Sequence, residues 1–258
     1  MRVTHMSGAG NDFAVIDARG LTLDFSQLAL KLCEQLDCDG FMAVDHSDTA
    51  DFRLHFYNAD GSRGEMCGNG SRCICKFAYD LGIAGEEMTV QTDAGIVYGW
   101  RLGENQYRVK LNNPGVTDLK RKEDVAYIEL GTPGVPHAVK RVPGLNHADR
   151  EKLRELGVSL RYDPAFPKGA NVNFYDWLDE KTIRILTYER GVEDYTLACG
   201  TGSASVVSVL YLRGELTENT LSVENPGGML SVRLEGDNGQ VQALYLEGPA
   251  QVIKAFDM

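Results

Sequence analysis

The chain has 258 residues, enough for one large domain or two modest ones with hydrophobic cores of their own. Its 43% hydrophobic and 24% charged residues are ordinary for a globular protein and exclude a disordered or collagen-like chain. The formal net charge of -11 argues against nucleic acid or an anionic membrane as a partner. No signal peptide and no run of about 18 apolar residues is found, so the expected compartment is the cytoplasm.

The predicted elements alternate between strands and helices along the chain. Apolar spacing of three and four residues predicts helices over 25–36, 70–81, 148–156 and 202–213. Runs rich in β-branched and aromatic residues predict strands over 3–6, 13–17, 52–57, 88–92, 107–111, 127–130, 172–174, 183–187 and 244–246. The helix over 202–213 is apolar on nearly every side, which predicts full burial. The turn residues at 112–115 predict a domain boundary.

An internal repeat organises the chain. Residues 56–79 and 187–211 each contain a strand ending near a Tyr, a polar turn, Cys-Gly-x-Gly-Ser and an apolar helix. The two turn cysteines, Cys67 and Cys199, are 132 residues apart, and a glycine turn follows 28 residues after the first and 29 after the second. Because the flanking elements agree as well, duplication of one unit explains the pattern better than chance.

The two Cys-Gly turns suggest a pair of acid/base thiols. In each half the cysteine and several unpaired backbone N–H groups stand at a helix N-terminus, where the helix dipole favours an anion and a thiolate. A thiolate can remove a proton from a carbon beside a carboxylate while a thiol returns one to the opposite face. We therefore predict inversion of such a centre by Cys67 and Cys199, without pyridoxal phosphate.

The remaining cysteines are predicted to be core residues. Cys73 lies on the apolar face of its helix beside Cys75, and Cys33 and Cys38 bracket the end of an amphipathic helix. A disulfide framework belongs to short secreted chains, and the spacing does not provide the paired ligands of a structural zinc site.

Several motifs resemble the diaminopimelate epimerase family, cofactor-independent enzymes of lysine and peptidoglycan biosynthesis. In chain order they are GAGNDF from Gly8, FYNADGS from Phe56, MCGNGSRC from Met66, GVPH from Gly134, ANVNF from Ala170, YERG from Tyr188, ACGTGSAS from Ala198 and PGG from Pro226. The resemblance covers the whole chain.

The resemblance implies a mixed α/β fold of two pseudo-symmetric domains. Each would wrap a mixed sheet or barrel around a central helix, with the active site in the cleft between them. We expect residues 1–113, joined by the C-terminal strand 247–258, to form the first domain and residues 114–246 the second. The expected partners are the small-molecule substrate diaminopimelate and a second copy of the chain in a homodimer, with no cofactor and no metal.

The resemblance also assigns roles to residues. It implies catalysis by Cys67, Cys199, His137 and Glu189. It implies substrate binding by Asn11, Asn58, Gly68, Asn69, Asn171, Glu189, Arg190, Gly200 and Thr201. The chemistry agrees, because an amino acid head group needs an Arg for its carboxylate and acid or amide oxygens for its ammonium. Read without the resemblance, Asn11 and Asn58 could be turn residues, and Glu189 with Arg190 a solvated ion pair.

Three positions depart from the pattern of other members. Val135 stands where some members have Asn, and Gly40 follows Asp39 where some have Gln. Tyr195 stands four residues before Cys199, where an acidic or small polar residue is expected, and it bears on substrate preference.

Other functions remain open alternatives. One is a cofactor-independent racemase of the same family that acts on another amino acid. A dithiol redox protein is disfavoured because no Cys-x-x-Cys is present. A non-catalytic amino-acid-binding protein is disfavoured because both turn cysteines are retained.

Overall fold

The computed structural model describes residues 1–64 and 68–258, which form two compact units. The first unit comprises Met1–Lys110 and Glu247–Met258, and the second comprises Leu111–Leu246. The predicted cut after Asn113 lies three residues further along the chain than this division.

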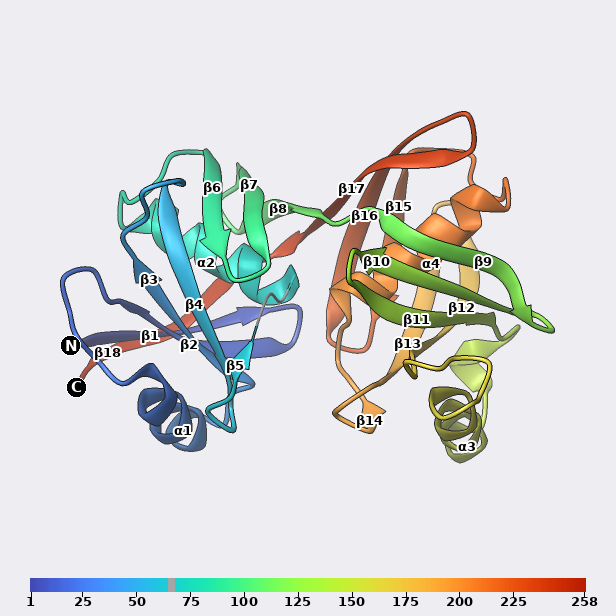
Figure 1. The fold of residues 1–258 in the computed structure, drawn as a ribbon, viewed down its shortest axis with the longest axis horizontal. Helices are drawn as coiled ribbons and strands as arrows, with labels where there is room; N and C mark the ends of the chain where they lie inside the picture. The colour runs from blue at the N-terminus through green and yellow to red at the C-terminus, as the bar shows by residue number, and fades with distance from the viewer. Residues whose placement is uncertain (65–67) are drawn as a thin grey trace. The chain divides into compact units, whose positions relative to one another are not determined.

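The first unit contains two helices and nine strands among its described residues (Figure 1). They are β1 (Arg2–Gly8), β2 (Asn11–Asp17), α1 (Phe25–Leu36), β3 (Gly40–Asp45), β4 (Phe52–Asn58), β5 (Arg63–Gly64), α2 (Gly68–Asp80), β6 (Glu87–Thr92), β7 (Gly95–Gly103), β8 (Gln106–Leu111) and β18 (Gln251–Asp257).

The second unit follows the same plan. Its elements are β9 (Pro114–Lys122), β10 (Val125–Gly131), β11 (Gly134–Arg141), the 3₁₀ turn η1 (Leu145–His147), α3 (Arg150–Arg161), β12 (Asn171–Asp179), β13 (Thr182–Glu189), β14 (Asp194–Tyr195), α4 (Gly200–Leu212), β15 (Thr220–Asn225), β16 (Gly228–Asp237) and β17 (Gln240–Pro249), whose last three residues belong to the first unit.

Strand pairing repeats between the units. In the first, β1 and β2 are antiparallel, β2 and β3 parallel, β3 and β4 antiparallel, and β4 and β6 parallel. In the second, β10, β11, β12, β13 and β15 pair in the same sequence of directions. A two-residue strand, β5 or β14, precedes the buried helix in each unit. The sequence repeat around the two Cys-Gly turns therefore extends to the fold of the two units.

Each sheet carries a helix on both faces. In the first unit α2 packs against β1, β2, β3 and β7, while α1 packs against β2, β3 and β4. In the second unit α4 packs against β10, β11, β12 and β16, and α3 against β12 and β13. Because α4 is enclosed, ten of its thirteen residues are buried, and Ser203 and Ser208 donate their hydroxyls to backbone carbonyls four residues earlier. The predicted burial is therefore confirmed for residues 202–210, whereas residues 211–213 are partly exposed.

Capping residues set the helix bounds. Asp24 accepts a hydrogen bond from the Gln27 N–H, and α1 spans the predicted residues. The prediction for 148–156 was wrong at both ends, because the N-cap residue Asp149 starts α3 at Arg150 and the helix continues to Arg161. The helices predicted over 70–81 and 202–213 each begin two residues earlier than expected.

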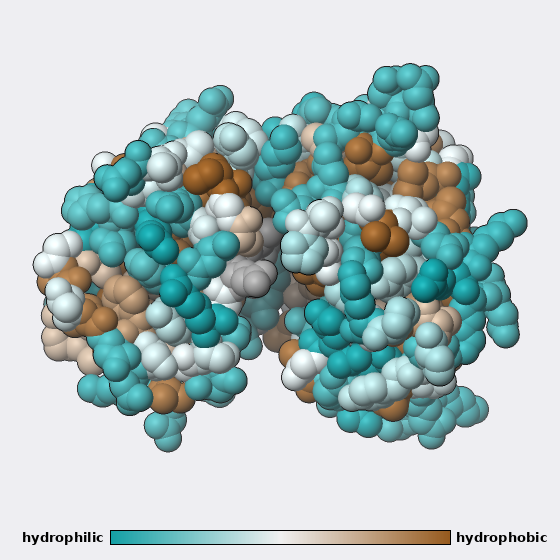
Figure 2. Space-filling model, viewed as in Figure 1, coloured by the Kyte–Doolittle hydropathy of each residue, from teal (hydrophilic) through white to brown (hydrophobic). Residues whose placement is uncertain are grey.

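Hydrophilic residues cover much of the visible face of each unit, with small groups of hydrophobic residues between them (Figure 2). No helix of the described residues is long and apolar enough to cross a membrane.

Candidate functional site

Cys199 occupies the N-cap position of α4 in the second unit. Its backbone is extended, and its Sγ accepts a hydrogen bond of 3.2 Å from the N–H of Gly202. The hydroxyl of Thr201 lies 3.6 Å from the same sulfur. The residue is only 8% exposed. The sulfur therefore stands at the positive end of a buried helix, a setting that stabilises a thiolate.

Gly202 allows α4 to pack closely against β12. A Cβ at this position would lie 2.3 Å from Oδ1 of Asn173 and 3.1 Å from Sγ of Cys199. The second glycine of the Cys-Gly-x-Gly motif is thus needed for packing, and Asn173 is the residue that it brings beside the cysteine.

Asn173 links the cysteine turn to His137. Its Oδ1 accepts a hydrogen bond from the Thr187 hydroxyl at 3.0 Å, which fixes the orientation of the amide. Its Nδ2 lies 3.1 Å from Nδ1 of His137 and also donates to the carbonyls of Ala138 and Asn171. Since the amide nitrogen can only donate, Nδ1 of His137 is the acceptor.

His137 is fully buried on β11. Burial lowers the pKa of its imidazole to about 3, and the positive charge of Arg190 acts in the same direction. The ring is therefore neutral near pH 7, with its proton on Nε2. That nitrogen has no hydrogen-bond partner among the described residues, so it offers a donor to a ligand.

Asn171 and Glu189 lie on the strands β12 and β13, and Arg190 follows β13 in a turn. Asn171 pairs with His137 in the β11–β12 register and is buried. Its side chain donates to the Pro136 carbonyl at 3.2 Å and accepts from the Arg190 backbone N–H at 2.9 Å. Glu189, the last residue of β13, is half-buried. The structure therefore brings these three predicted residues together with His137.

A buried acid, Glu129 on β10, belongs to the same end of the second unit. It accepts hydrogen bonds from the Tyr127 hydroxyl at 2.6 Å and from the Lys168 ammonium at 2.8 Å. Burial opposes ionisation, but these partners and Arg190 together hold the pKa of Glu129 below its ordinary value. Gly134 leaves room for this carboxylate, since a Cβ there would lie 2.5 Å from Cβ of Glu129.

In the first unit three predicted residues, Asn11, Gly68 and Asn69, lie together at the start of α2. Cys67 lies outside the described residues, and Gly68 and Asn69 open the helix. Asn69 donates to Oδ1 of Asn11, while the fully buried Arg72 donates to Oδ1 of Asn69 at 3.0 Å. Asn11 in turn donates to the Asp39 carboxylate at 3.2 Å. Asn11 and Asn69 are thus held together by a polar network.

Asn58 is held in a local turn at the end of β4. Its side chain donates to the Ser62 hydroxyl at 3.0 Å, and its backbone N–H donates to the Ser62 carbonyl. The structure therefore does not join Asn58 to Asn11 and Asn69 by hydrogen bonds among the described contacts.

Local contacts explain two of the three positions that depart from the family pattern, Tyr195 and Gly40. Tyr195 donates its hydroxyl to the Arg150 carbonyl at 3.1 Å and packs edge-on against Tyr188, so it ties β14 to the helix α3. At Gly40 a Cβ would lie 2.8 Å from the Phe56 ring and the Tyr57 carbonyl. Val135 is 39% exposed, and nothing in the structure explains its side chain.

The four cysteines predicted as core residues, Cys33, Cys38, Cys73 and Cys75, are buried. Burial raises the pKa of Cys75 to about 12, which fits an inert thiol.

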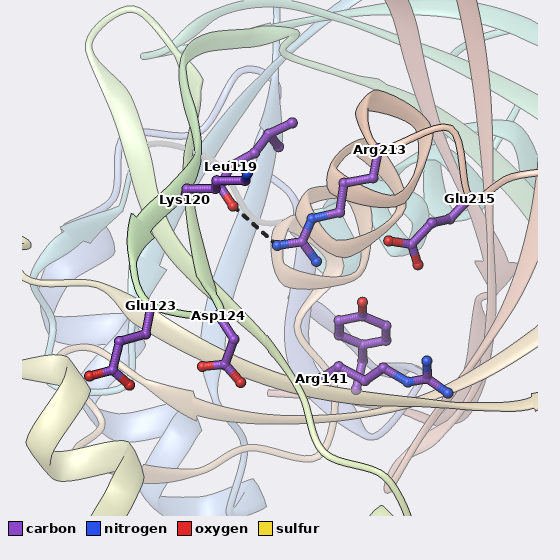
Figure 3. Close-up of a pocket in the computed structure, with 8 residues that line it drawn as sticks. Leu119, Lys120, Glu123, Asp124, Arg141, Arg213 and Glu215 are labelled. Atoms are coloured by element: carbon purple, nitrogen blue, oxygen red, sulfur yellow. Dashed lines mark hydrogen bonds between the residues drawn. The ribbon is translucent and has the colours of Figure 1, made fainter.

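A surface pocket of about 410 Å³ lies at the opposite end of α4 (Figure 3). Its lining residues are Leu119, Lys120, Glu123, Asp124, Arg141, Tyr175, Arg213 and Glu215. Arg213 follows the last residue of the helix and donates to the Leu119 carbonyl at 3.2 Å. The length of the helix, about 20 Å at 1.5 Å per residue, separates this pocket from Cys199.

Sequence reasoning missed Asn173, Glu129 and Lys168. The alternation in Asn-Val-Asn could have indicated Asn173, because residues two apart on a strand share one face. Glu129 and Lys168 are 39 residues apart and carry no motif, so only the fold brings them together.

Comparison with known sequences decides the family. The sequence model described as diaminopimelate epimerase matches residues 3–113 and 131–253. The chain belongs to the diaminopimelate epimerase family. A diaminopimelate epimerase of Aquifex aeolicus is 36% identical over 100% of this chain and 96% of its own length. One of Caldanaerobacter subterraneus is 35% identical over 98% and 97%.

The fold also resembles solved structures. A phenazine biosynthesis protein of the PhzF family from Bacillus anthracis has a TM-score of 0.75 at 16% identity, over 100% of this chain and 98% of that protein. This likeness confirms the predicted mixed α/β fold of two repeated domains.

Proposed function

We propose that the protein is a diaminopimelate epimerase, an isomerase that interconverts LL-2,6-diaminopimelate and meso-diaminopimelate by inverting one α-carbon. The observation that carries the proposal is the buried sulfur of Cys199 at the N-terminus of α4. In the sequence repeat, α4 and Cys199 correspond to α2 and Cys67. The full-length similarity to enzymes of that name supports the substrate.

The reaction needs one base and one acid on opposite faces of the α-carbon. We assign these roles to Cys67 and Cys199: a thiolate takes the α-proton, and a thiol on the other side gives its proton to the carbanion. The N–H groups of Gly200 and Thr201, and those of Gly68 and Asn69, would hold the reacting carboxylate and stabilise its developing charge.

His137 and Glu189 would assist from the second unit. The neutral His137 offers its Nε2–H as a donor to substrate. Glu189 provides a carboxylate for a substrate ammonium, and Asn171 positions the Arg190 backbone beside it.

The second amino acid group of diaminopimelate, distant from the reacting carbon, would be bound by the remaining predicted polar residues. Arg190 would bind the distal carboxylate, and Asn11, Asn58 and Asn69 would provide amide groups from the first unit. A monocarboxylic amino acid would lack the charge-assisted hydrogen bonds that a distal carboxylate forms with the guanidinium.

The first prediction is inversion with solvent exchange. Incubation of LL-2,6-diaminopimelate with the protein in heavy water should give the meso isomer with deuterium at the inverted α-carbon, without added cofactor, and proton NMR measures both. Cys199→Ala and Cys67→Ala should each lower the epimerisation rate by at least ~10³-fold, because each removes one of the two proton-transfer groups.

Cys33→Ala is the matched control, because it removes a buried thiol from α1 and should leave the rate near that of the unchanged protein. Full activity of Cys199→Ala would contradict the two-thiol mechanism. Faster turnover of alanine, glutamate, lysine or histidine than of diaminopimelate would instead favour a racemase acting on another amino acid.

A further inference from the structure

Glu129 is the one buried carboxylate among the residues that the structure describes. An acid side chain that is 5% exposed needs a cation beside it, because burial without a partner penalises the charged form. Lys168 supplies this cation through its Nζ, 2.8 Å from Oε2, while the Tyr127 hydroxyl occupies Oε1.

Arg190 is a second cation close to the same acid. Its charge contributes to lowering the pKa values of Glu129 and His137, so it lies within electrostatic reach of both. Its Nη1, however, donates to the backbone carbonyl of Lys168 at 3.0 Å rather than to Glu129. The side chain of Lys168 thus neutralises the acid, while its backbone orients the guanidinium.

We propose that Lys168 is a positioning residue for substrate selection: it occupies Glu129 so that Arg190 stays available for the distal carboxylate of the substrate. Without the ammonium, the buried carboxylate of Glu129 attracts the neighbouring guanidinium and competes with the substrate for it. This inference rests on the proposed function, in which Arg190 binds the distal carboxylate.

The test compares diaminopimelate with L-lysine, which lacks the distal carboxylate. Lys168→Met should raise KM for diaminopimelate by at least ~10-fold and keep kcat within ~3-fold. The contact between Arg190 and the distal carboxylate is equally strong in the ground state and the transition state, so its loss weakens binding without slowing the chemical step. The rate of α-hydrogen exchange of L-lysine, which we expect to be slow, should not change. Lys168→Arg should keep the low KM, and so should Lys152→Met, which removes an exposed charge from the same unit.

The double variant Glu129→Gln with Lys168→Met tests whether Glu129 competes with the substrate for Arg190. Removing the acid removes the competitor, so KM for diaminopimelate should return to within ~3-fold of that of Glu129→Gln alone. An unchanged KM in Lys168→Met, or a double variant as impaired as Lys168→Met, overturns the proposal. If the unchanged protein does not prefer diaminopimelate over L-lysine, the proposed function fails instead.

Discussion

His137 shows how burial sets the state of a single residue. Its ring accepts through Nδ1 from Asn173 and is fully buried on β11, so the protonated form would place a charge in the core. The cost appears as the lowered pKa of about 3. A histidine in this state serves as a neutral hydrogen-bond donor rather than as a general acid at neutral pH.

The lowered pKa of His137 makes stability depend on pH. Above pH 6.5, the ordinary pKa, the imidazole is neutral in both folded and unfolded chains and contributes no pH dependence. As the pH falls below 6.5 only the unfolded chain takes up the proton, so stability is lost progressively until about pH 3. At ~1.4 kcal/mol per pH unit, the loss from this residue between pH 6.5 and 5 is about 2 kcal/mol.

Urea unfolding at pH 7 and pH 5 measures this effect. His137→Gln cannot titrate, so its free energy of unfolding should fall less between the two pH values than that of the unchanged protein. His147→Gln, at an exposed histidine of η1, should behave like the unchanged protein. An equal loss in His137→Gln and the unchanged protein would show that this buried imidazole does not titrate as described.

At the scale of elements, α4 carries the sulfur and its start depends on close packing. An Ala at position 202 would ordinarily favour a helix over Gly by about 1 kcal/mol. Here the added Cβ lies 2.3 Å from the Asn173 amide, and overpacking of this kind typically costs about 1 to 3 kcal/mol or more. We therefore expect Gly202→Ala to destabilise the protein and displace Cys199.

Thermal unfolding and the epimerisation rate together check this expectation. Gly202→Ala should lower both, whereas Gly85→Ala, where a new Cβ meets nothing closer than 3.9 Å, should lower neither. A Gly202→Ala protein that is more stable than the unchanged one would mean that α4 can shift without cost.

Helices and strands could be predicted from the sequence where they bury one face or carry a capping residue. The helix α1 was predicted to the residue from its apolar spacing, because Asp24 caps the helix where that spacing begins. The edge strand β9 was missed because most of its residues are not buried, so no alternation of apolar and polar residues marks it.

The site was predictable only where a repeat or a motif marked it. Cys199 stood out because its turn occurs twice, and the structure places it where that pattern implied. The Glu129 and Lys168 pair had no such mark, since its geometry depends on bringing β10 beside the segment before β12.

At the scale of the whole molecule, the first unit is built from both ends of the chain. The strand β18 pairs with β1 along most of its length, and the N-terminal ammonium donates to the Met258 carbonyl at 2.7 Å. Pro249 and Glu247 also contact the first unit, through the buried Arg72 and through Arg108.

Removal of residues 247–258 should therefore destabilise only the first unit. Hydrogen exchange should quicken in β1 and β8, which lose strand partners, while β13 and β15 keep their protection because their partners lie within residues 111–246. Mass spectrometry of exchanged peptides measures both units in one sample. Equal loss of protection in the second unit would show that the two units unfold together.

This chain path also sets an order for folding during synthesis. The second unit is one continuous segment, so the whole of Leu111–Leu246 is present once residue 246 has left the ribosome. The first unit, although translated first, must wait with β1 unpaired on one side until β18 emerges. Domains usually complete in the order of translation, but here the later half can finish first, because the N-terminal half depends on residues 247–258, which follow the second unit in the chain.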